Sequence, residues 1–351
     1  MTLKVAVVGT GRMGKLHARV LSEMPSVELV GVCDANPAAA QAVAAQRNCR
    51  SFTDLAELIP LIDAAIVAVP TVHHITVARM LVSAGKSVLI EKPLTNDLAA
   101  AMELIELARR HHVTVQVGHT ERFNPAVVAM KKHAIRPKFI ESHRISPFTF
   151  RSSDVGVVLD MMIHDIDIVL MLAGQTEVAH VEAVGVSVIG NTEDIANARV
   201  IFTNGCTANI TASRLAIKTE RKVRVFSEEA YLSVDYQKKT GIVVKKSENA
   251  DLLNLARHFA VDNLADLAQQ VDYAKLVKVE ELTVEDSGEP LRRQAESFVH
   301  SVVDGVRPEV SAEDGLAALR LAHQITQAIQ SHQWDGNPQG RIGPAVLKDP
   351  D

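Results

Sequence analysis

Short apolar runs alternate with longer mixed stretches along the first third of the chain. The runs are rich in β-branched residues and predict strands at Lys4–Val8, Glu28–Cys33, Ala64–Val69, Ser87–Ile90 and Thr114–Gly118. They are continuous rather than alternating, which is typical of strands in a parallel sheet with helices on both faces. The stretches between them predict helices at Met13–Ser22, Pro37–Gln46, Thr53–Ile59, Ile75–Ala84 and Asn96–His111. This alternation predicts right-handed βαβ units and therefore an α/β domain.

The pattern changes after about residue 122. Two helices are predicted first, at Pro125–His133 and Val157–Leu172. Strand-like runs then extend from His180 to Val244, and the turn signal at Thr203–Gly205 favours hairpins. Helices return at Pro290–Asp304 and Ala312–Ser331. This half of the chain predicts an α+β domain around a mainly antiparallel open sheet.

Two domains are also expected from length, because a single hydrophobic core rarely extends over 351 residues. The predicted boundaries are 1–122 for the α/β domain and 123–351 for the α+β domain. Residues 248–272 are predicted as an inserted helical segment within the second domain.

Composition narrows the class of protein. The chain is 47% hydrophobic and 23% charged with a formal net charge of −5, which is ordinary for a globular protein and argues against a nucleic-acid partner. The three cysteines form no CxxC pair, which favours a reducing, cytoplasmic location. Neither a signal peptide nor an 18-residue apolar run is apparent, so no membrane association is expected.

A glycine motif lies directly after the first predicted strand and directly before the first predicted helix. It reads Gly9-x-Gly11-x-x-Gly14 in "VAVVGTGRMG". The first glycine permits a tight turn, the second lets the backbone approach a pyrophosphate, and the third lets helix and strand pack closely. In this context the motif predicts a Rossmann dinucleotide-binding domain; the alternative is a glycine-rich turn without a ligand. The motif also places Arg12 and Met13 at the cofactor.

An acid follows the second predicted strand. Asp34 comes twenty residues after Gly14, the expected distance for a carboxylate that binds a ribose 2′-hydroxyl. Its charge would repel a 2′-phosphate, and "DANP" supplies no cation to offset it. The sequence therefore predicts NAD rather than NADP, although a turn role for Asp34 is compatible with the same pattern.

The fifth predicted strand ends unusually, in "LIEKPLT". Leu89 and Ile90 continue the apolar run, and Glu91, Lys92 and Pro93 end it. The carboxyl edge of an open α/β sheet is where ligands bind. A proline also biases the preceding residue towards an extended backbone, which would aim the lysine side chain consistently.

The predicted helix at Val157–Leu172 carries ionisable residues on an otherwise apolar sequence. Asp160, His164 and Asp167 follow one another at i, i+4 and i+7, so they share one helical stripe. Such groups are costly on a buried helix unless they are paired or functional. The alternative to a functional role is a structural histidine–aspartate pair.

Four stretches together resemble the glucose-fructose oxidoreductase / inositol dehydrogenase / MocA (Gfo/Idh/MocA) family of NAD(P)-dependent sugar oxidoreductases. They are "VAVVGTGRMG", "VPTVHH", "GKSVLIEKPLT" and "LDMMIHDIDI". The resemblance implies that Lys92 lies beside the nicotinamide and the substrate hydroxyl, and that Asp160 and His164 belong to the catalytic site. It further places Pro70, Thr71, His74 and Glu91 near the cofactor.

Two positions depart from the family pattern. Many members have asparagine where this chain has Thr71, and many have several glycines before the catalytic helix where this chain keeps only Gly156. The first departure concerns one cofactor contact, and the second concerns the alignment of a loop. Neither affects Asp160 or His164.

The expected chemistry is hydride transfer from a sugar carbon to the nicotinamide. His164 is the best general base by residue type, since an unperturbed histidine has a pKa near 6.5. Lys92 would donate a hydrogen bond to the reacting oxygen, Asp160 would position the substrate or tune its neighbours, and Asp167 could orient the imidazole. No metal is expected, because the sequence has no HExxH motif or cysteine–histidine cluster.

The stretch "VGHTERFNPAV" resembles the subgroup of this family that acts on UDP-linked amino sugars. It implies oxidation of the 3-hydroxyl of UDP-N-acetylglucosamine to a 3-keto sugar, which a partner transaminase could convert for lipid A or a surface glycan. Arg122 and Arg151 are candidate ligands of the diphosphate, with Arg144 a further possibility; surface salt bridges are the alternative for each. Phe123 and Asn124 are candidate contacts of the sugar or uridine, and the alternative for them is helix-start packing.

Two other functions remain open on the sequence. One is a dehydrogenase of a free polyol or sugar such as myo-inositol, and the other is a non-catalytic NAD-binding regulator, which would usually lack the lysine or the histidine. One face of the antiparallel sheet is expected to be available for a second copy, so a homodimer or homotetramer is predicted.

Overall fold

A computed structural model of the chain describes residues 2–133, 135–149, 155–247, 277–285, 288–334 and 341–343. The chain divides into two compact units, and the main change between them falls at Phe123 and Asn124. The first unit also takes in Ile166–Ile168 and Ser287–Gln324, and the second unit holds the rest. The expected segment 248–272 lies outside the described residues. No helix in the described part of the chain is long and apolar enough to cross a membrane.

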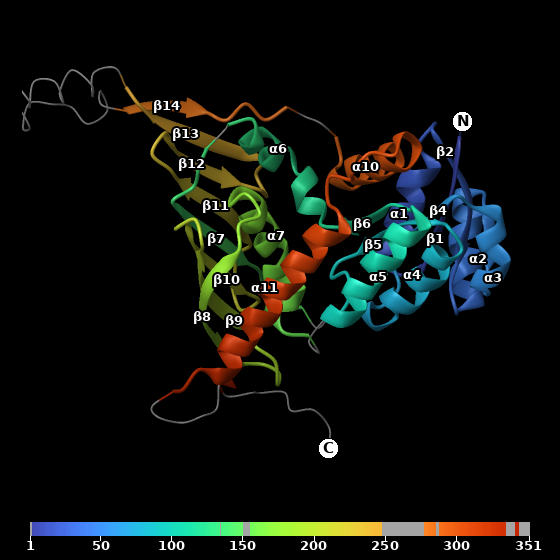
Figure 1. Ribbon diagram of the computed structural model, residues 1–351, viewed down its shortest axis with the longest axis horizontal. Helices are drawn as coiled ribbons and strands as arrows, with labels where there is room; N and C mark the ends of the chain where they lie inside the picture. The colour runs from blue at the N-terminus through green and yellow to red at the C-terminus, as the bar shows by residue number, and fades with distance from the viewer. Residues whose placement is uncertain are drawn as a thin grey trace, which may run out of the picture. The chain divides into compact units, whose positions relative to one another are not determined.

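The first unit is built on a parallel sheet, drawn in blue to teal in Figure 1. Its strand order among the described residues is β3-β2-β1-β4-β5-β6, and every pairing is parallel. This order reverses at β1, so the carboxyl ends of β1 and β4 flank the point where such sheets bind ligands. The strands are β1 (Leu3–Val8), β2 (Val27–Cys33), β3 (Arg50–Phe52), β4 (Ala64–Val67), β5 (Ser87–Glu91) and β6 (Val115–Gly118).

Helices cover this sheet. α1 and α10 pack against each other, and so do α4 and α5. The bounds are α1 (Arg12–Ser22), α2 (Pro37–Arg47), α3 (Leu55–Leu58), α4 (His74–Ser83), α5 (Leu98–His111) and α10 (Pro290–Asp304), with short 3₁₀ turns η1 (Ile59–Leu61), η2 (Thr71–His73) and η3 (Thr120–Phe123).

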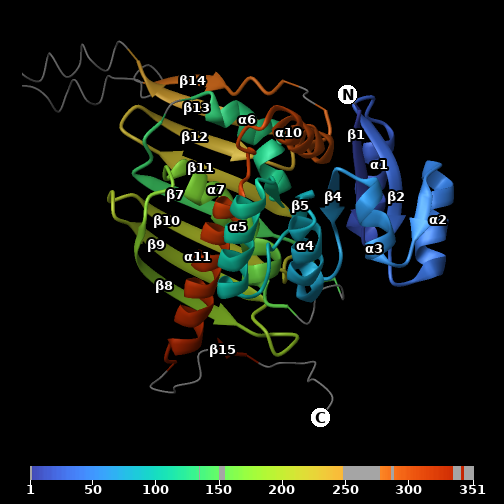
Figure 2. The ribbon, with the colours of Figure 1, turned by 45° about the vertical axis from the view of Figure 1, so that its right-hand side comes forward.

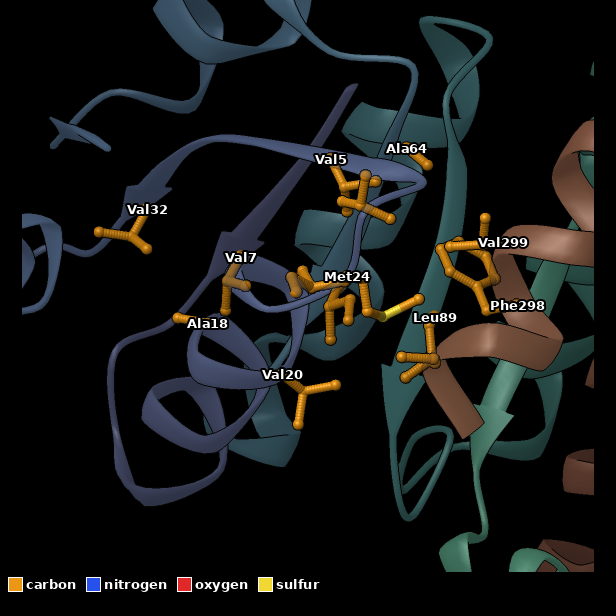
Figure 3. Packing of buried hydrophobic residues seen from close by; sticks show 14 of the residues in the cluster. Val5, Val7, Ala18, Val20, Met24, Val32, Ala64, Leu89, Phe298 and Val299 are labelled. Atoms are coloured by element: carbon orange, nitrogen blue, oxygen red, sulfur yellow. The ribbon is translucent and has the colours of Figure 1, made fainter. Parts of the chain in front are cut away.

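A hydrophobic cluster joins one face of the parallel sheet to its helices. Figure 3 shows Val5 and Val7 of β1 and Leu89 of β5 beside side chains of α1 and α10. Phe298 of α10 is completely buried in this cluster, and burial of a side chain of that size stabilises a fold by about 1.5–3 kcal/mol. Helix α10, from the C-terminal part of the chain, is therefore part of the core of the first unit.

The second unit is built on a larger sheet, seen with its strands labelled in Figure 2. Its order among the described residues is β14-β13-β12-β11-β7-β10-β9-β8-β15. The pairings are antiparallel except β7 with β10 and β8 with β15. The strands are β7 (Phe139–Ile145), β8 (Val178–Val186), β9 (Ile195–Phe202), β10 (Thr207–Ser213), β11 (Glu220–Phe226), β12 (Ala230–Asp235), β13 (Thr240–Lys246), β14 (Val277–Glu281) and β15 (Arg341–Ile342).

Alternation along these strands separates two faces of the sheet. On the central strands β7, β9, β10 and β11, alternate residues are buried, while those between them are half-buried or exposed. The buried face carries Ile140, Ala198, Ile210 and Val223, and the other face carries polar residues such as Glu141, Arg199 and Lys222. The remaining helical elements are α6 (Pro125–Lys131), the π-helical turn η4 (Val158–Met162), α7 (Ile163–Leu172) and α11 (Ala312–Ser331).

The predicted fold class is confirmed: a parallel Rossmann sheet is followed by a mostly antiparallel sheet. Four of the described strands were absent from the sequence prediction: β3, β7, β14 and β15. β3 has only three residues, Arg50–Phe52, and β7 alternates polar with apolar residues outside the region where strands were expected. β7 is nonetheless a central strand, paired with both β10 and β11.

Candidate active site

The loop between β1 and α1 is shaped to admit a phosphate. Gly9 has a φ of +93°, and a Cβ there would lie 2.6 Å from the carbonyl oxygen of Ala68. A Cβ on Gly14 would lie 1.8 Å from the carbonyl oxygen of Gly9, whereas one on Gly11 would meet nothing within 4 Å. α1 starts after Gly11 with no side-chain cap and no acid in its first turn, which leaves the partial positive charge of its N-terminus without a side-chain counter-charge from that turn. These residues fit the pyrophosphate of a dinucleotide.

Asp34 lies beside this loop, immediately after β2. Its Oδ2 accepts hydrogen bonds from the backbone N–H and the hydroxyl of Thr10, both at 2.7 Å, and its Oδ1 accepts one from the N–H of Asn36 at 2.9 Å. Burial alone would raise the pKa of Asp34, but the hydrogen bonds from Asn36 and Thr10 outweigh it and hold the pKa below its ordinary value. An ionised carboxylate at this position suits the hydroxyls of a ribose.

Two alanine substitutions in the glycine loop are expected to act differently. Gly11→Ala should change the free energy of unfolding by less than about 1 kcal/mol, because its Cβ meets open space. It should weaken NAD binding by about tenfold or more, since the new methyl group occupies the space a phosphate approaches. Gly14→Ala should destabilise the fold by about 1–3 kcal/mol or more through its clash with Gly9. Urea unfolding and NAD titration of both variants check this; similar losses of stability would count against the assignment.

Lys92 is half-buried and follows β5 directly. The residue before it, Glu91, is buried and accepts a hydrogen bond from Nε2 of His17 on α1 at 2.6 Å. The peptide bond between Lys92 and Pro93 is cis. Lys92 therefore lies at the carboxyl edge of the sheet. The residue before it is fixed by the buried pair of Glu91 and His17.

His74 was expected near the cofactor, and the structure buries it. Its Nδ1 lies 2.9 Å from the carbonyl oxygen of Pro93, its Nε2 lies 2.9 Å from that of Val69, and the residue is 1% exposed. Burial lowers the pKa of His74, and the hydrogen bonds to Pro93 and Val69 act in the opposite direction. Because protein carbonyls lie beside both ring nitrogens, His74 braces two loops, and its place near the cofactor stays a prediction. Pro70 and Thr71 precede it at the start of η2.

The helix that carries the other predicted catalytic residues has two kinds of polar position. Asp160 lies in the π-helical turn η4 and His164 in the first turn of α7, and both are half-buried. π-Helical turns occur frequently at functional sites. Asp165, in contrast, is 1% exposed and is paired with Arg144 and hydrogen-bonded to Ser142 on β7. Asp160 and His164 thus remain the accessible pair, while Asp165 fastens the helix to the sheet.

Arg122 and Asp167 form a buried ion pair within the first unit. Nε and a terminal nitrogen of Arg122 donate to the two carboxylate oxygens of Asp167 at 2.8 and 2.7 Å. The other terminal nitrogen donates to the carbonyl oxygen of Glu309 at 3.2 Å and lies 3.6 Å from Asp314. Burial alone would lower the pKa of Arg122, but Asp167 outweighs it and the pKa is raised. This corrects two expectations: Arg122 faces protein carboxylates rather than a diphosphate, and Asp167 binds Arg122 rather than orienting an imidazole.

The remaining substrate candidates are also accounted for. Asn124 is 8% exposed; its Oδ1 accepts from the N–H of Ala126 at the start of α6, and its Nδ2 donates to the carbonyl oxygen of Tyr236. Phe123 is 6% exposed, which fits helix-start packing. Arg144 is engaged by Asp165, and Arg151 lies outside the described residues. Direct substrate contacts from Phe123, Asn124 and Arg151 stay predictions.

One buried residue of the motif "VGHTERFNPAV" received no role from the sequence. His119 is 1% exposed, and neither ring nitrogen has a hydrogen-bond partner among the described residues. Glu91 of β5 is in register with Gly118 of β6, so Lys92 and His119 are the next residues along the two strands. Burial lowers the pKa of His119, and the nearby charge of Asp167 acts in the opposite direction.

Replacing His119 should change how stability depends on pH. The unfolded chain takes up a proton below the ordinary histidine pKa of about 6.5, while the folded chain resists it, so His119 costs stability as the pH falls. The free energy of unfolding of His119→Phe, relative to that of the native chain, should therefore rise by up to about 1.4 kcal/mol as the pH falls from 8 to 5.5. Urea unfolding of both proteins at the two pH values measures the gap. A gap independent of pH would show that His119 does not carry this linkage.

Gly156, the one glycine kept before the catalytic helix, makes room for a buried carboxylate. A Cβ there would lie 2.0 Å from Oε1 of Glu193. That oxygen accepts a hydrogen bond from the N–H of Val158 at 3.3 Å, and the carbonyl oxygen of Glu193 accepts one from Val157 at 3.0 Å. Glu193 therefore caps the start of the helical segment that carries Asp160 and His164.

The glycine loop, Asp34 and Lys92 belong to one sheet edge and fit a nicotinamide dinucleotide, so the fold and site define an NAD-binding oxidoreductase. No cluster of metal-ligating side chains occurs among the described residues. The chain matches two family models: the NAD-binding Rossmann fold of the oxidoreductase family, over residues 3–119, and the Gfo/Idh/MocA C-terminal domain, over residues 133–233. It belongs to the Gfo/Idh/MocA family, whose members among its relatives are sugar and polyol dehydrogenases.

Two relatives and one solved structure illustrate the similarity. The UDP-N-acetylglucosamine 3-dehydrogenase of Acidithiobacillus ferrooxidans is 36% identical over 68% of this chain and 75% of its own length. The inositol 2-dehydrogenase of Rhizobium meliloti is 26% identical over 94% of this chain and 97% of its own. A structure of the Acidithiobacillus enzyme has a TM-score of 0.83 and 30% identity, covering 93% of this chain and 97% of that one.

Proposed function

We propose that this protein oxidises the 3-hydroxyl of UDP-N-acetylglucosamine to a 3-keto sugar with NAD. The observation that carries the proposal is the 36% identity to a UDP-N-acetylglucosamine 3-dehydrogenase. The structural similarity to the same enzyme, with a TM-score of 0.83, supports it. Asp34 supports NAD over NADP, because its ionised carboxylate would repel a 2′-phosphate.

In the proposed mechanism each catalytic side chain has one task. His164 accepts the proton of the substrate hydroxyl, a role worth about 10²- to 10⁴-fold in rate. Lys92 donates a hydrogen bond to the same oxygen and stabilises its developing negative charge. Asp160, one helical turn before His164, positions the substrate or tunes the imidazole. NAD, when bound at the glycine loop, supplies the acceptor for the hydride that leaves the sugar carbon.

The proposed product suggests what comes next. A ketone beside the acetamido carbon is a substrate for transamination, so a pathway transaminase that installs a 3-amino group is the expected partner activity. Such an amino sugar would suit lipid A or a surface glycan.

Turnover with a panel of sugars tests the proposal. UDP-N-acetylglucosamine should give NADH, followed by its absorbance, at a higher kcat/KM than myo-inositol or free N-acetylglucosamine. The free sugar is the matched control because it lacks only the nucleotide. Absence of NADH with every compound would favour the non-catalytic regulator and overturn the proposal.

A second candidate is a myo-inositol dehydrogenase. It is favoured by the inositol 2-dehydrogenase relative, which aligns over 94% of this chain, against 68% for the nucleotide-sugar relative. The engagement of Arg122 by carboxylates also removes one candidate ligand of a diphosphate. A higher kcat/KM for myo-inositol in the same panel would establish this alternative.

We also propose that the protein is a homodimer or homotetramer that assembles through the outer face of the nine-stranded sheet. This face carries the ring contacts of Phe226 with Phe139 and Tyr231, on β11, β7 and β12. Phe226 is 37% exposed. Light scattering of the native chain should give twice or four times the chain mass, and Phe226→Asp should shift it towards the monomer; a native monomer would contradict the proposal.

A further inference from the structure

Both neighbours of Lys92 in the sequence are held by buried histidines from different helices. His17 of α1 is completely buried and donates through Nε2 to the carboxylate of Glu91 at 2.6 Å. His74 of α4 is 1% exposed and lies 2.9 Å from the carbonyl oxygen of Pro93. The lysine therefore lies between two anchored residues, and neither anchor takes part in the proposed chemistry.

The His17–Glu91 pair is buried between the end of strand β5 and helix α1. Glu91 is the last residue of β5 and is opposite Gly118 on β6. A Cβ on Gly118 would lie 3.2 Å from Oε2 of Glu91, so the glycine leaves the room that the carboxylate fills. On the other side, His17 is on the buried face of α1 with Gly14 and Leu21.

A buried carboxylate and a buried imidazole are expensive components of a core, because leucine or phenylalanine would pack there without desolvation cost. Their hydrogen bond fixes the side chain of Glu91 in one direction, and with it the backbone that leads into Lys92. α1 is also the helix whose N-terminus fits the pyrophosphate. His17 is three residues beyond Gly14, so one rigid helix connects the phosphate loop to the residue before Lys92.

His74 performs the matching task on the far side of the lysine. Its two ring nitrogens contact the carbonyl oxygens of Pro93 and Val69, which ties the loop after β5 to the loop after β4. Carbonyl oxygens only accept hydrogen bonds and a neutral imidazole has one N–H, so the ring donates to one of the two carbonyls and packs against the other.

We propose that His17, through Glu91, and His74, through Pro93, are positioning residues that aim the amino group of Lys92. The inference rests on the proposed function in one respect, that Lys92 acts on the substrate oxygen. Misplacement of a reacting group by about 1 Å costs on the order of 10²-fold in rate. Loss of the His17 anchor is therefore expected to lower kcat far more than it changes KM for NAD.

Competitive acetylation of the lysines, read by mass spectrometry as a function of pH, tests the positioning without cofactor or substrate. The variants are His17→Leu, which removes the donor, and His17→Gln, whose side-chain amide places an N–H near the position of Nε2. The pH dependence of Lys92 labelling should shift in His17→Leu and return towards native in His17→Gln. Labelling of Lys138, which is 62% exposed, is the internal control and should not change.

Turnover is measured on the same proteins, with Glu91→Met as a further variant in case His17→Leu unfolds. Glu91→Met keeps about the length of the side chain and removes the carboxylate oxygens that accept from His17. We expect kcat to fall on the order of 10²-fold in His17→Leu and to be largely rescued in His17→Gln.

The two parts of the test separate two failures. Native-like labelling of Lys92 in folded His17→Leu or Glu91→Met overturns the positioning role, whatever the substrate is. A shift in Lys92 labelling together with no activity of the native chain on UDP-N-acetylglucosamine overturns the proposed substrate and leaves the positioning role in place.

Discussion

Replacing His164 with alanine should lower kcat by about 10²- to 10⁴-fold, because it removes the proposed base for the proton of the substrate hydroxyl. NAD affinity should change little, since the glycine loop and Asp34 lie on other elements. The part of the pH dependence of kcat that comes from the imidazole should also disappear. Steady-state kinetics across pH 6–9 and a separate NAD titration measure these effects.

Lys92→Ala should cause a loss of similar size for a different reason. In the proposed mechanism its amino group stabilises negative charge as it develops on the oxygen, and removal of one such donor costs about 10²- to 10³-fold in kcat. The double variant should be little worse than either single variant, because residues that act on one transition state are not additive.

His111→Ala provides the matched control for both substitutions. His111 is an exposed histidine at the end of α5 and should leave kcat unchanged. If His164→Ala or Lys92→Ala kept full turnover, the proposed mechanism would be wrong even though the fold and the family would stand.

Arg122→Leu should lower the free energy of unfolding by about 3–5 kcal/mol, the cost of breaking a buried ion pair and leaving the partner charge uncompensated. Asp167 and Asp314 would both lose the guanidinium, and Asp167 is completely buried. The loss should shrink in a double variant that also replaces Asp167 with leucine, because no buried charge at that position is then unpaired. Urea unfolding of the three proteins gives the comparison.

The matched control is Arg109→Leu, which breaks an ion pair with Glu313 in which the two side chains are 63% and 48% exposed. Solvent screens such a pair, so the expected loss is within about 1 kcal/mol. Equal losses for Arg122 and Arg109 would contradict the structural role assigned to the buried pair.

The sequence was sufficient for those features that depend on local patterning. The parallel sheet of the first unit follows from continuous apolar runs, and the positions of Gly9, Gly14 and Asp34 follow from the spacing of the motif. Strand β7 was missed, because its alternating residues bury only one face and its partners β10 and β11 are more than sixty residues away in the chain. Long-range pairing of this kind leaves little local signal.

The site was harder to predict wherever burial decides the role of a polar residue. Asp160, Asp165 and Asp167 are equivalent acids in the sequence, and one helix presents them to different surroundings: Asp160 is half-buried, Asp165 pairs with Arg144, and Asp167 pairs with Arg122. Helical spacing identifies which side chains point in the same direction, but it does not reveal which residues of other elements they contact.

Histidines show the same limit. His17 and His119 carry no motif that separates them from surface histidines, and only the structure shows that they are buried beside Glu91 and after Gly118. The one available signal was that His17 shares the buried helical stripe with Gly14 and Leu21. An ionisable residue on such a stripe is a useful marker of a buried polar contact.

We propose that this chain removes hydride from carbon 3 of UDP-N-acetylglucosamine and delivers it to NAD. Incubation of the native enzyme with NAD and the substrate deuterated at carbon 3 tests it directly, with mass spectrometry of both products. The deuterium should appear in the reduced nicotinamide and be lost from the keto sugar. Retention of the deuterium in the sugar, with unlabelled NADH or with none formed, would contradict it.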